Sequence, residues 1–212
     1  AHGLEVGDKK SLNRLYVDLR TGALGLSDSP HVVALVGGGE WGPRLVAKAL
    51  LGSMYANWVK DTVVLDMEEA VRIYHESGFD EAQAWLKRRV LSAIERCPQK
   101  AIVVLDNTQV LSGSDLLLLD TFLLLFDDGL SLMEYDGRRV SGDGSLFLLL
   151  VNEENTEEAQ HLGAKDRLLK TWAYTGPEFT PAAFVGRIDA AMVVSPAPRL
   201  SAVDRAAIQT IW

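Results

Sequence analysis

The sequence contains a single cysteine among its 212 residues, Cys97, which excludes a disulfide within the chain and a zinc site built on cysteines. The four histidines are scattered without the spacing of metal ligands; they are His2, His31, His75 and His161. We therefore expect no bound metal. One thiol does not distinguish a reducing from an oxidising compartment, so composition leaves the localisation open.

Basic residues are in the minority. The chain has 21 Lys and Arg against 29 Asp and Glu, which gives a formal net charge of −8 and a pI of about 5.0. Because no basic stripe is present to neutralise phosphates, we expect no binding of nucleic acid. The densest basic cluster, residues 87–89, is typical of the solvated face of a helix.

Hydrophobic runs long enough to span a bilayer are lacking as well. The two longest, residues 116–126 and residues 146–151, fall far short of the roughly 20 residues that a membrane helix needs. No signal peptide opens the sequence, which begins at Ala1 rather than Met and is compatible with an excised domain. A membrane anchor outside residues 1–212 stays open.

Short apolar runs alternate with helical patterns along the chain, and 48% hydrophobic content is enough for one substantial core. Residues 79–97 show the spacing of an amphipathic helix, and residues 116–126, apolar almost all round, predict a buried helix. We expect one α/β domain, with a parallel sheet covered by helices on both faces and ligands at the carboxyl ends of the strands. The predicted strands cover residues 32–36, 62–65, 102–105, 146–151 and 191–194.

A glycine-rich segment follows the first predicted strand as a phosphate-binding loop does. Such a loop reads GxxxxGK[ST], where the lysine reaches the phosphates and the hydroxyl binds magnesium. Gly37 and Gly42 keep the spacing, but Pro43 replaces the lysine and Arg44 replaces the hydroxyl, while Glu40 adds a negative charge. Pro43 still suits the start of a helix reaching to about residue 55. The segment is thus either a dismantled nucleotide site or an ordinary Gly-rich turn.

A second segment carries the same kind of loss. In P-loop ATPases a buried strand ends in an aspartate that holds magnesium, and a following acid polarises the attacking water. Here the strand at residues 102–105 leads to Asp106, but Asn107 replaces the acid. An amide is no general base, so the hydrolytic step loses its usual helper.

Two further segments carry a family resemblance. Residues 130–152 contain a predicted hairpin with its turn at Asp136 and Gly137, then an apolar strand that ends in Asn152. This resembles the hairpin and sensor 1 strand of Clp-type AAA+ ATPases and torsins. Residues 183–196, AFVGRIDAAMVVSP, resemble the arginine-finger segment of the same family; the matching positions are Phe184, Arg187, Ile188, Asp189 and Pro196.

The resemblance implies the large domain of a AAA+ protein, a P-loop NTPase-like fold, across roughly residues 30–200. Residues 1–29 are then a lead-in with a helix, and residues 200–212 a C-terminal helix. The helical lid of active relatives has no expected counterpart. With its nucleotide site degenerate at Gly37, Gly42, Pro43, Arg44, Asp106, Asn107 and Asn152, the chain is expected to bind no nucleotide cofactor and to be a pseudo-ATPase.

A AAA+-like domain that keeps its arginine finger is similar to the luminal activators of torsin ATPases, of the lamina-associated polypeptide type. This resemblance implies a torsin-like ATPase as partner in a hetero-oligomer, Arg187 acting in trans on the partner's nucleotide, and a place in the endoplasmic reticulum lumen or perinuclear space.

Three alternatives stay open. The chain is an ATPase with weak or unusual nucleotide binding in which Arg44 substitutes for the lysine, or a structural subunit that only fills a place in a ring. Alternatively, Arg187 is a surface arginine on a helix at about residues 181–189, paired with Asp189.

Overall fold

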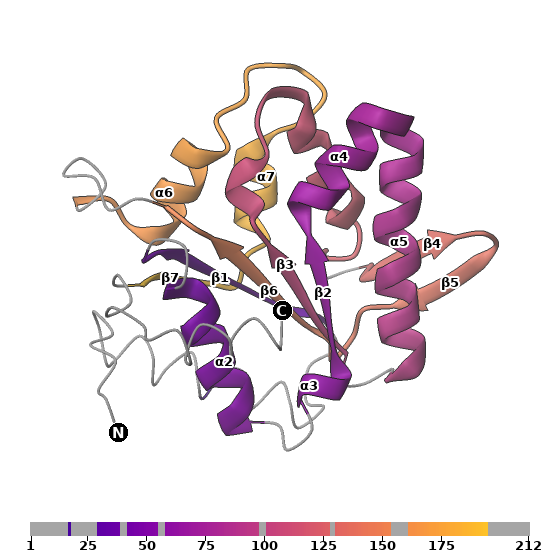
Figure 1. Cartoon of the computed structure of the whole chain (residues 1–212), viewed down its shortest axis with the longest axis horizontal. Helices are drawn as coiled ribbons and strands as arrows, with labels where there is room; N and C mark the ends of the chain where they lie inside the picture. The colour runs from indigo at the N-terminus through magenta and orange to yellow at the C-terminus, as the bar shows by residue number, and fades with distance from the viewer. Residues whose placement is uncertain are drawn as a thin grey trace.

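The computed structural model describes residues 17, 29–38, 42–54, 58–97, 101–127, 130–153 and 161–194. Its centre is a parallel five-stranded sheet with the order β2-β3-β6-β1-β7 (Figure 1). The strands are β1 (His31–Gly37), β2 (Thr62–Asp66), β3 (Ile102–Asp106), β6 (Leu146–Val151) and β7 (Ala190–Val194). All five predicted strands are confirmed within about one residue.

Helices cover both faces of the sheet, as the α/β pattern predicts (Figure 1). One face carries α2 (Gly42–Met54); the other carries α4 (Met67–Ser77), α5 (Phe79–Arg96), α6 (Ala164–Thr171) and α7 (Pro181–Gly186), and the short α3 (Trp58–Asp61) leads into β2. Side chains of a strand alternate between the two faces. Along β1, Val33 and Leu35 therefore pack toward α2, whereas Val32, Ala34 and Val36 belong to the larger core on the opposite face.

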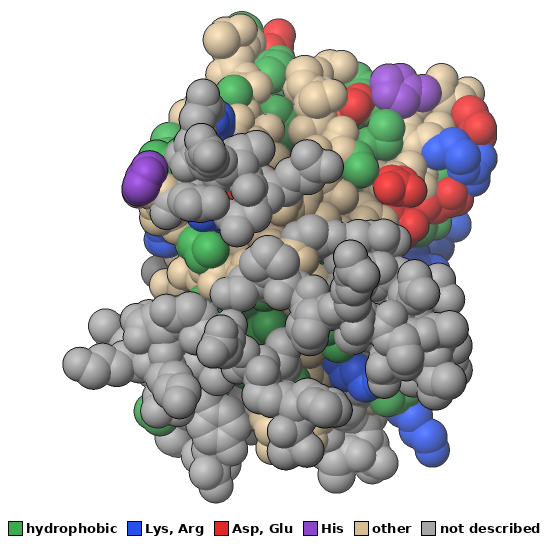
Figure 2. Space-filling model, turned by 60° about the vertical axis from the view of Figure 1, so that its left-hand side comes forward, with side chains coloured by type: hydrophobic (Ala, Val, Ile, Leu, Met, Phe, Trp, Pro, Cys, Tyr) green, Lys and Arg blue, Asp and Glu red, His purple; other side chains and the backbone are tan. Residues whose placement is uncertain are grey.

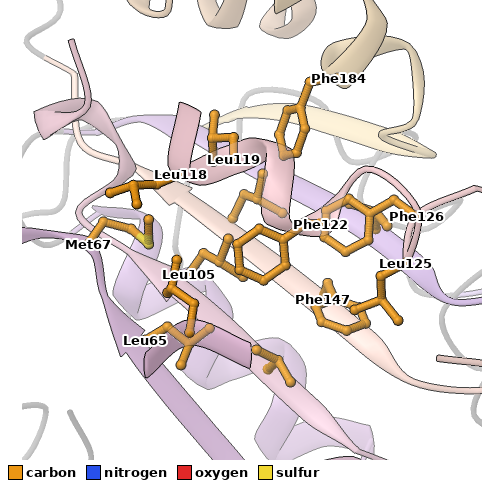
Figure 3. Packing of buried hydrophobic residues seen from close by; sticks show 14 of the residues in the cluster. Leu65, Met67, Leu105, Leu118, Leu119, Phe122, Leu125, Phe126, Phe147 and Phe184 are labelled. Atoms are coloured by element: carbon orange, nitrogen blue, oxygen red, sulfur yellow. The ribbon is translucent and has the colours of Figure 1, made fainter. Parts of the chain in front are cut away.

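The larger core contains a cluster of phenylalanine rings (Figure 3). The Phe126 ring lies 4.9 Å from that of Phe147, 5.6 Å from Phe122 and 5.8 Å from Phe184, between centroids. Because these rings come from α7, from β6 and from the segment after β3, burying them ties α7 and the segment after β3 to the sheet.

The buried helix predicted at residues 116–126 is the 3₁₀-helix η2 (Gly113–Phe122), preceded by the short 3₁₀-turn η1 (Thr108–Val110). Leu116, Leu118, Leu119 and Phe122 are all buried, so the burial is confirmed, while the helix begins and ends three to four residues earlier than predicted. A run that is apolar on every side has no 3.6-residue period to select an α-helix, so packing against α5 and the sheet decides its winding.

The predicted hairpin is confirmed. Strands β4 (Leu132–Tyr135) and β5 (Arg138–Ser141) pair antiparallel. Asp136 has φ 53° and Gly137 has φ 71°, the positive values that a two-residue hairpin turn of type I′ requires. The hairpin packs beside α5, where an Arg138 guanidinium nitrogen lies 3.2 Å from a Glu95 carboxylate oxygen.

Helix α5 confirms the amphipathic pattern, but α7 ends earlier than predicted. It stops at Gly186, and Arg187 caps it with φ −85° and ψ −2°. Asp189 explains the stop, since its backbone N–H bonds the Val32 carbonyl and its carboxylate accepts from the Val32 N–H at 2.7 Å. These bonds direct the chain into β7 and end the helix. Apart from Val17, the helices expected within residues 1–29 and 200–212 lie outside the described residues, as do Glu40 and Pro196.

Surface charges are interspersed where the structure describes them. The guanidinium of Arg72 on α4 lies 2.6 Å from the carboxylates of both Glu69 and Glu76. Figure 2 shows acidic and basic side chains next to each other in the coloured part of the face that it draws. Within the described ranges, no helix is both long enough and apolar enough to cross a membrane.

Candidate functional site

The glycine loop leaves the sheet at the carboxyl end of β1. Gly37 and Gly38 have φ values of 95° and 74°, which only glycine adopts readily. A Cβ on Gly37 would also lie 3.2 Å from the Val194 carbonyl oxygen and 3.3 Å from Nη1 of Arg167. Both the positive φ and the close neighbours therefore favour glycine at position 37. After residues 39–41, which lie outside the described part, Gly42 and Pro43 open α2 at the predicted place.

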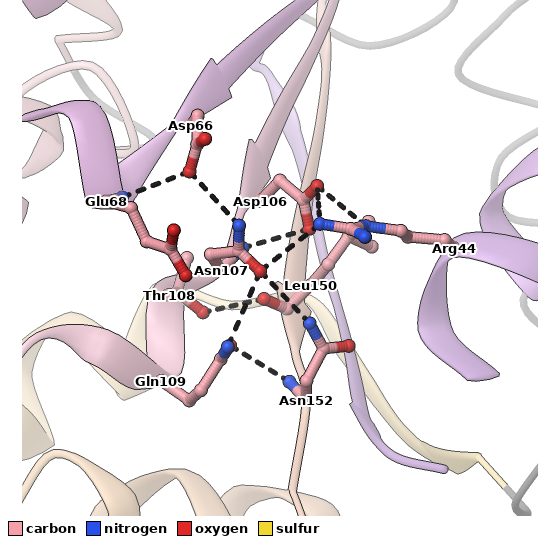
Figure 4. A network of polar contacts seen from close by, with 9 residues as sticks. All are labelled: Arg44, Asp66, Glu68, Asp106, Asn107, Thr108, Gln109, Leu150 and Asn152. Atoms are coloured by element: carbon pink, nitrogen blue, oxygen red, sulfur yellow. Dashed lines mark hydrogen bonds and ion pairs between the residues drawn. The ribbon is translucent and has the colours of Figure 1, made fainter. Parts of the chain in front are cut away.

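Arg44, in the first turn of α2, forms an ion pair with Asp106 at the end of β3 (Figure 4). Its Nε and Nη2 both lie 2.8 Å from Oδ2 of the carboxylate. The Asp106 side chain is 4% exposed and that of Arg44 is 15% exposed, so water screens this pair little. The other oxygen of Asp106 accepts the backbone N–H of Asn107 at 2.9 Å. Both carboxylate oxygens are thus engaged by donors from the chain itself.

Asn107 is the centre of the surrounding network (Figure 4). Its amide oxygen accepts from Nη2 of Arg44 and from Nδ2 of Asn152, each at 3.2 Å, and its own Nδ2 donates to Asp66 at 3.1 Å. The backbone N–H of Asn152 donates to Gln109 at 3.1 Å. The network joins α2 to the carboxyl ends of β2, β3 and β6, the edge where a parallel sheet binds ligands.

The pKa of Asp106 is raised, chiefly because burial disfavours its charged form. The hydrogen bond and positive charge of Arg44 act the other way and lower this pKa, whereas the nearby Asp66 raises it further. Arg44 is therefore the cation that opposes the effect of burial on the Asp106 carboxylate. In an active P-loop site, magnesium and its ligands have that place.

The arrangement leaves no ready place for a metal. Binding magnesium to Asp106 would require Arg44 to leave, since the guanidinium already contacts the carboxylate oxygen Oδ2. Over the described ranges, no group of three or more His, Cys, Asp or Glu side chains is placed to hold an ion.

Sequence reasoning missed three residues of this edge. Asp66 lies in register with Asp106 on the neighbouring strand, and this signal was available because both aspartates follow a buried apolar run. Gln109 and Arg167 had no comparable signal. Arg167 is 3% exposed, its Nη1 lies 3.5 Å from Glu153, and it contacts the start of the glycine loop.

Arg187 lies near the amino ends of the strands, whereas this network lies at their carboxyl ends. Arg187 follows α7 and precedes the start of β7, beside Val32 rather than Gly37. Val32 and Gly37 are five steps apart along β1, about 16 Å at a strand rise of roughly 3.3 Å. The structure thus brings Arg44, Asp106, Asn107 and Asn152 together and leaves Arg187 apart.

The Arg187 guanidinium is only partly satisfied. Nη1 donates to the Ala183 carbonyl at 3.0 Å, and Nη2 lies 3.4 Å from Asp127. Nε is buried without a hydrogen-bond partner among the described residues, and 31% of the side chain is exposed. Asp127 is an ion-pair partner of Arg187, and the Asp189 carboxylate accepts the backbone N–H of Val32.

The network explains why an amide occupies position 107, and the substitution Asn107→Asp tests it. Aspartate tolerates the left-handed φ of 56° found here, but it would place a third carboxylate beside Asp66 and Asp106 with one guanidinium to neutralise them. We expect Asn107→Asp to lower the free energy of unfolding at pH 7 by about 1–3 kcal/mol. Urea titrations at pH 7 and pH 4.5 should show a smaller loss at the lower pH; an equal loss would contradict the electrostatic reason.

Comparison with known proteins places the fold. No protein-family model and no curated protein matches the sequence. Among solved structures, the chain is similar to the Hsp104–ADP complex of S. cerevisiae, with a TM-score of 0.57 and 16% sequence identity over 95% of this chain. It spans about a third of the matched protein, 34% of that chain. The chain therefore has an α/β, P-loop NTPase-like fold of the AAA+ type.

Proposed function

We propose that this chain is a non-catalytic AAA+-like domain that docks beside an active ATPase of the torsin type and activates its ATP hydrolysis by supplying Arg187. The observation that carries the proposal is an asymmetry between the two edges of the sheet. One edge is closed by an internal ion pair, and the other presents an incompletely satisfied guanidinium.

At the closed edge, Arg44 has the role that magnesium and the phosphates have in an active enzyme. Its guanidinium neutralises Asp106 at 2.8 Å and bonds Asn107, the residue that stands in the place of the catalytic acid. Binding Mg·ATP here would break this pair and bring phosphate charge to a loop without a lysine. The edge therefore supports a pseudo-ATPase.

At the other edge, Arg187 offers a group that suits the terminal phosphate of a nucleotide. An arginine carries five N–H donors in a planar fork, of which this one directs single bonds to Ala183 and Asp127. An arginine supplied in trans stabilises the charge that develops in phosphoryl transfer. Since Arg187 is remote from the chain's own site, that phosphate must belong to another subunit.

The torsin type of partner, the hetero-oligomer and the place in the endoplasmic reticulum lumen or perinuclear space come from the sequence resemblance and are part of the proposal. Mixing the chain with a torsin and measuring the rate of ATP turnover tests it directly. Stimulation by the chain supports the proposal, and an unchanged rate across candidate torsins refutes it.

One observation favours a second candidate, a structural subunit of a ring. Arg187 caps α7 and links it to Asp127, so the residue has a structural role that needs no nucleotide. This candidate predicts that the chain binds a partner ATPase without changing its rate.

The closed edge predicts that the isolated chain binds neither ATP nor ADP. Calorimetric titration with Mg·ATP should show no heat of binding up to about millimolar nucleotide, because Pro43 and Arg44 supply neither phosphate lysine nor magnesium hydroxyl. The variant Pro43→Lys/Arg44→Thr restores both groups and is the matched comparison. Micromolar binding by the unmodified chain would contradict the prediction and favour an unusual ATP-binding protein.

A further inference from the structure

Two of the most exposed large hydrophobic side chains in the described residues lie on one loop. Leu124 is 62% exposed and Leu130 is 54% exposed. Both belong to the connection from η2 to β4, and the loop closes on itself because the Leu132 N–H donates to the Leu124 carbonyl at 3.3 Å. An exposed leucine is unremarkable alone, but two on one short loop indicate a contact surface.

The loop also holds Arg187. Asp127 lies between the two leucines in sequence, and its carboxylate is the ion-pair partner of the guanidinium at 3.4 Å. The backbone N–H of Leu130 donates to the Asp127 carbonyl at 3.2 Å, so the backbone of Leu130 lies next to the residue that pairs with Arg187. The two exposed leucines therefore lie on the loop that also supplies the ion-pair partner of Arg187.

We propose that Leu124 and Leu130 form the apolar rim of a docking surface centred on Arg187, and that its occupant is the edge of an ATPase subunit that presents the terminal phosphate of bound ATP. This inference rests on the proposed function and adds the surface that provides affinity. Charge complementarity selects the occupant, since the centre of the surface offers N–H donors to an anion and the rim offers hydrocarbon.

The two leucines supply the affinity and keep water away from the centre of the surface, whereas Arg187 acts on the nucleotide during hydrolysis. Excluding water strengthens the attraction between guanidinium and phosphate, because the effective dielectric constant falls. Asp127 is 36% exposed and holds Arg187 at a long 3.4 Å, a weak contact that a phosphate can replace.

The test uses a torsin whose catalytic glutamate is replaced by glutamine, loaded with Mg·ATP, as the binding probe. Leu124→Ser/Leu130→Ser should weaken its binding to this chain about 100-fold, roughly tenfold for each leucine that loses its buried area. The matched control is Val59→Ser/Leu169→Ser, which removes two other exposed apolar side chains on α3 and α6, 53% and 37% exposed. The control should bind within about twofold of the unmodified chain.

The outcomes separate this inference from the proposed function. If Leu124→Ser/Leu130→Ser, the rim variant, binds the torsin as tightly as the unmodified chain does, the docking surface is overturned. The proposed function still holds in that case if the unmodified chain stimulates ATP turnover. Sedimentation that shifts from dimer to monomer in the rim variant, with unchanged torsin binding, also overturns the docking surface, because the occupant is then a second copy. Absence of both binding and stimulation by the unmodified chain refutes the proposed function and the surface with it. Thermal melting of each variant establishes that it is folded.

Discussion

Arg187→Ala is expected to abolish the stimulation of a partner torsin while leaving the fold and the complex nearly intact. An arginine finger supplied in trans is worth about three to five orders of magnitude in rate, so the stimulated turnover should fall to the basal rate of the partner. The structural loss is small: the side chain gives up one bond to Ala183 and a partly exposed ion pair with Asp127, worth about 0–1 kcal/mol.

The measurement is the ATPase rate of the partner at saturating concentrations of the chain, with complex formation followed by gel filtration. Arg187→Lys should fail as well, because lysine lacks the planar fork. Arg88→Ala is the matched control, since Arg88 is an exposed arginine on α5. If Arg187→Ala binds normally and stimulates fully, Arg187 is not an arginine finger.

Arg44→Met is expected to give the largest loss of stability of any substitution at the closed edge. It keeps the length of the side chain but leaves the buried Asp106 carboxylate without its cation, and breaking a buried pair in this way costs about 3 kcal/mol or more. For a domain of this size the melting temperature should fall by about 6–12 °C. Arg72→Met, at an exposed ion-paired arginine on α4, is the control and should cost under about 1 kcal/mol.

The loss should depend on pH in a defined direction. The pKa of Asp106 is already raised by burial, and removing Arg44 takes away its largest lowering influence, so the pKa rises further. A carboxyl group whose folded pKa exceeds the unfolded value, about 3.9, destabilises the fold as pH rises through that range. The deficit of Arg44→Met should therefore be larger at pH 7.5 than at pH 4.5 in urea titrations.

A double variant tests whether the charge of Asp106 is the cause. In Arg44→Met/Asp106→Asn the uncompensated carboxylate is gone, so most of the stability should return and the dependence on pH should disappear. If the double variant is as unstable as Arg44→Met, or if the deficit of Arg44→Met is the same at both pH values, packing rather than charge explains the effect.

Much of the secondary structure can be predicted from the sequence because its causes are local. The five strands are short β-rich apolar runs, α5 shows a 3.6-residue period, and the hairpin turn follows from Asp136 and Gly137, which tolerate positive φ. The sequence pattern does not specify the winding of η2, because packing on all sides decides it, and the early end of α7 was mispredicted, because a bond between Asp189 and Val32 decides it.

The same distinction between local and long-range causes holds for the residues of the candidate site. The loss of the lysine, the magnesium hydroxyl and the catalytic acid follows from the sequence alone, because Pro43, Arg44 and Asn107 stand at fixed spacings in the motifs. The partners of the two arginines depend on the tertiary fold: Arg44 reaches Asp106 across 62 positions, and Arg187 reaches Asp127 across 60. Neither contact leaves a periodic trace in the sequence, because it is the parallel sheet and its crossovers that bring those side chains together.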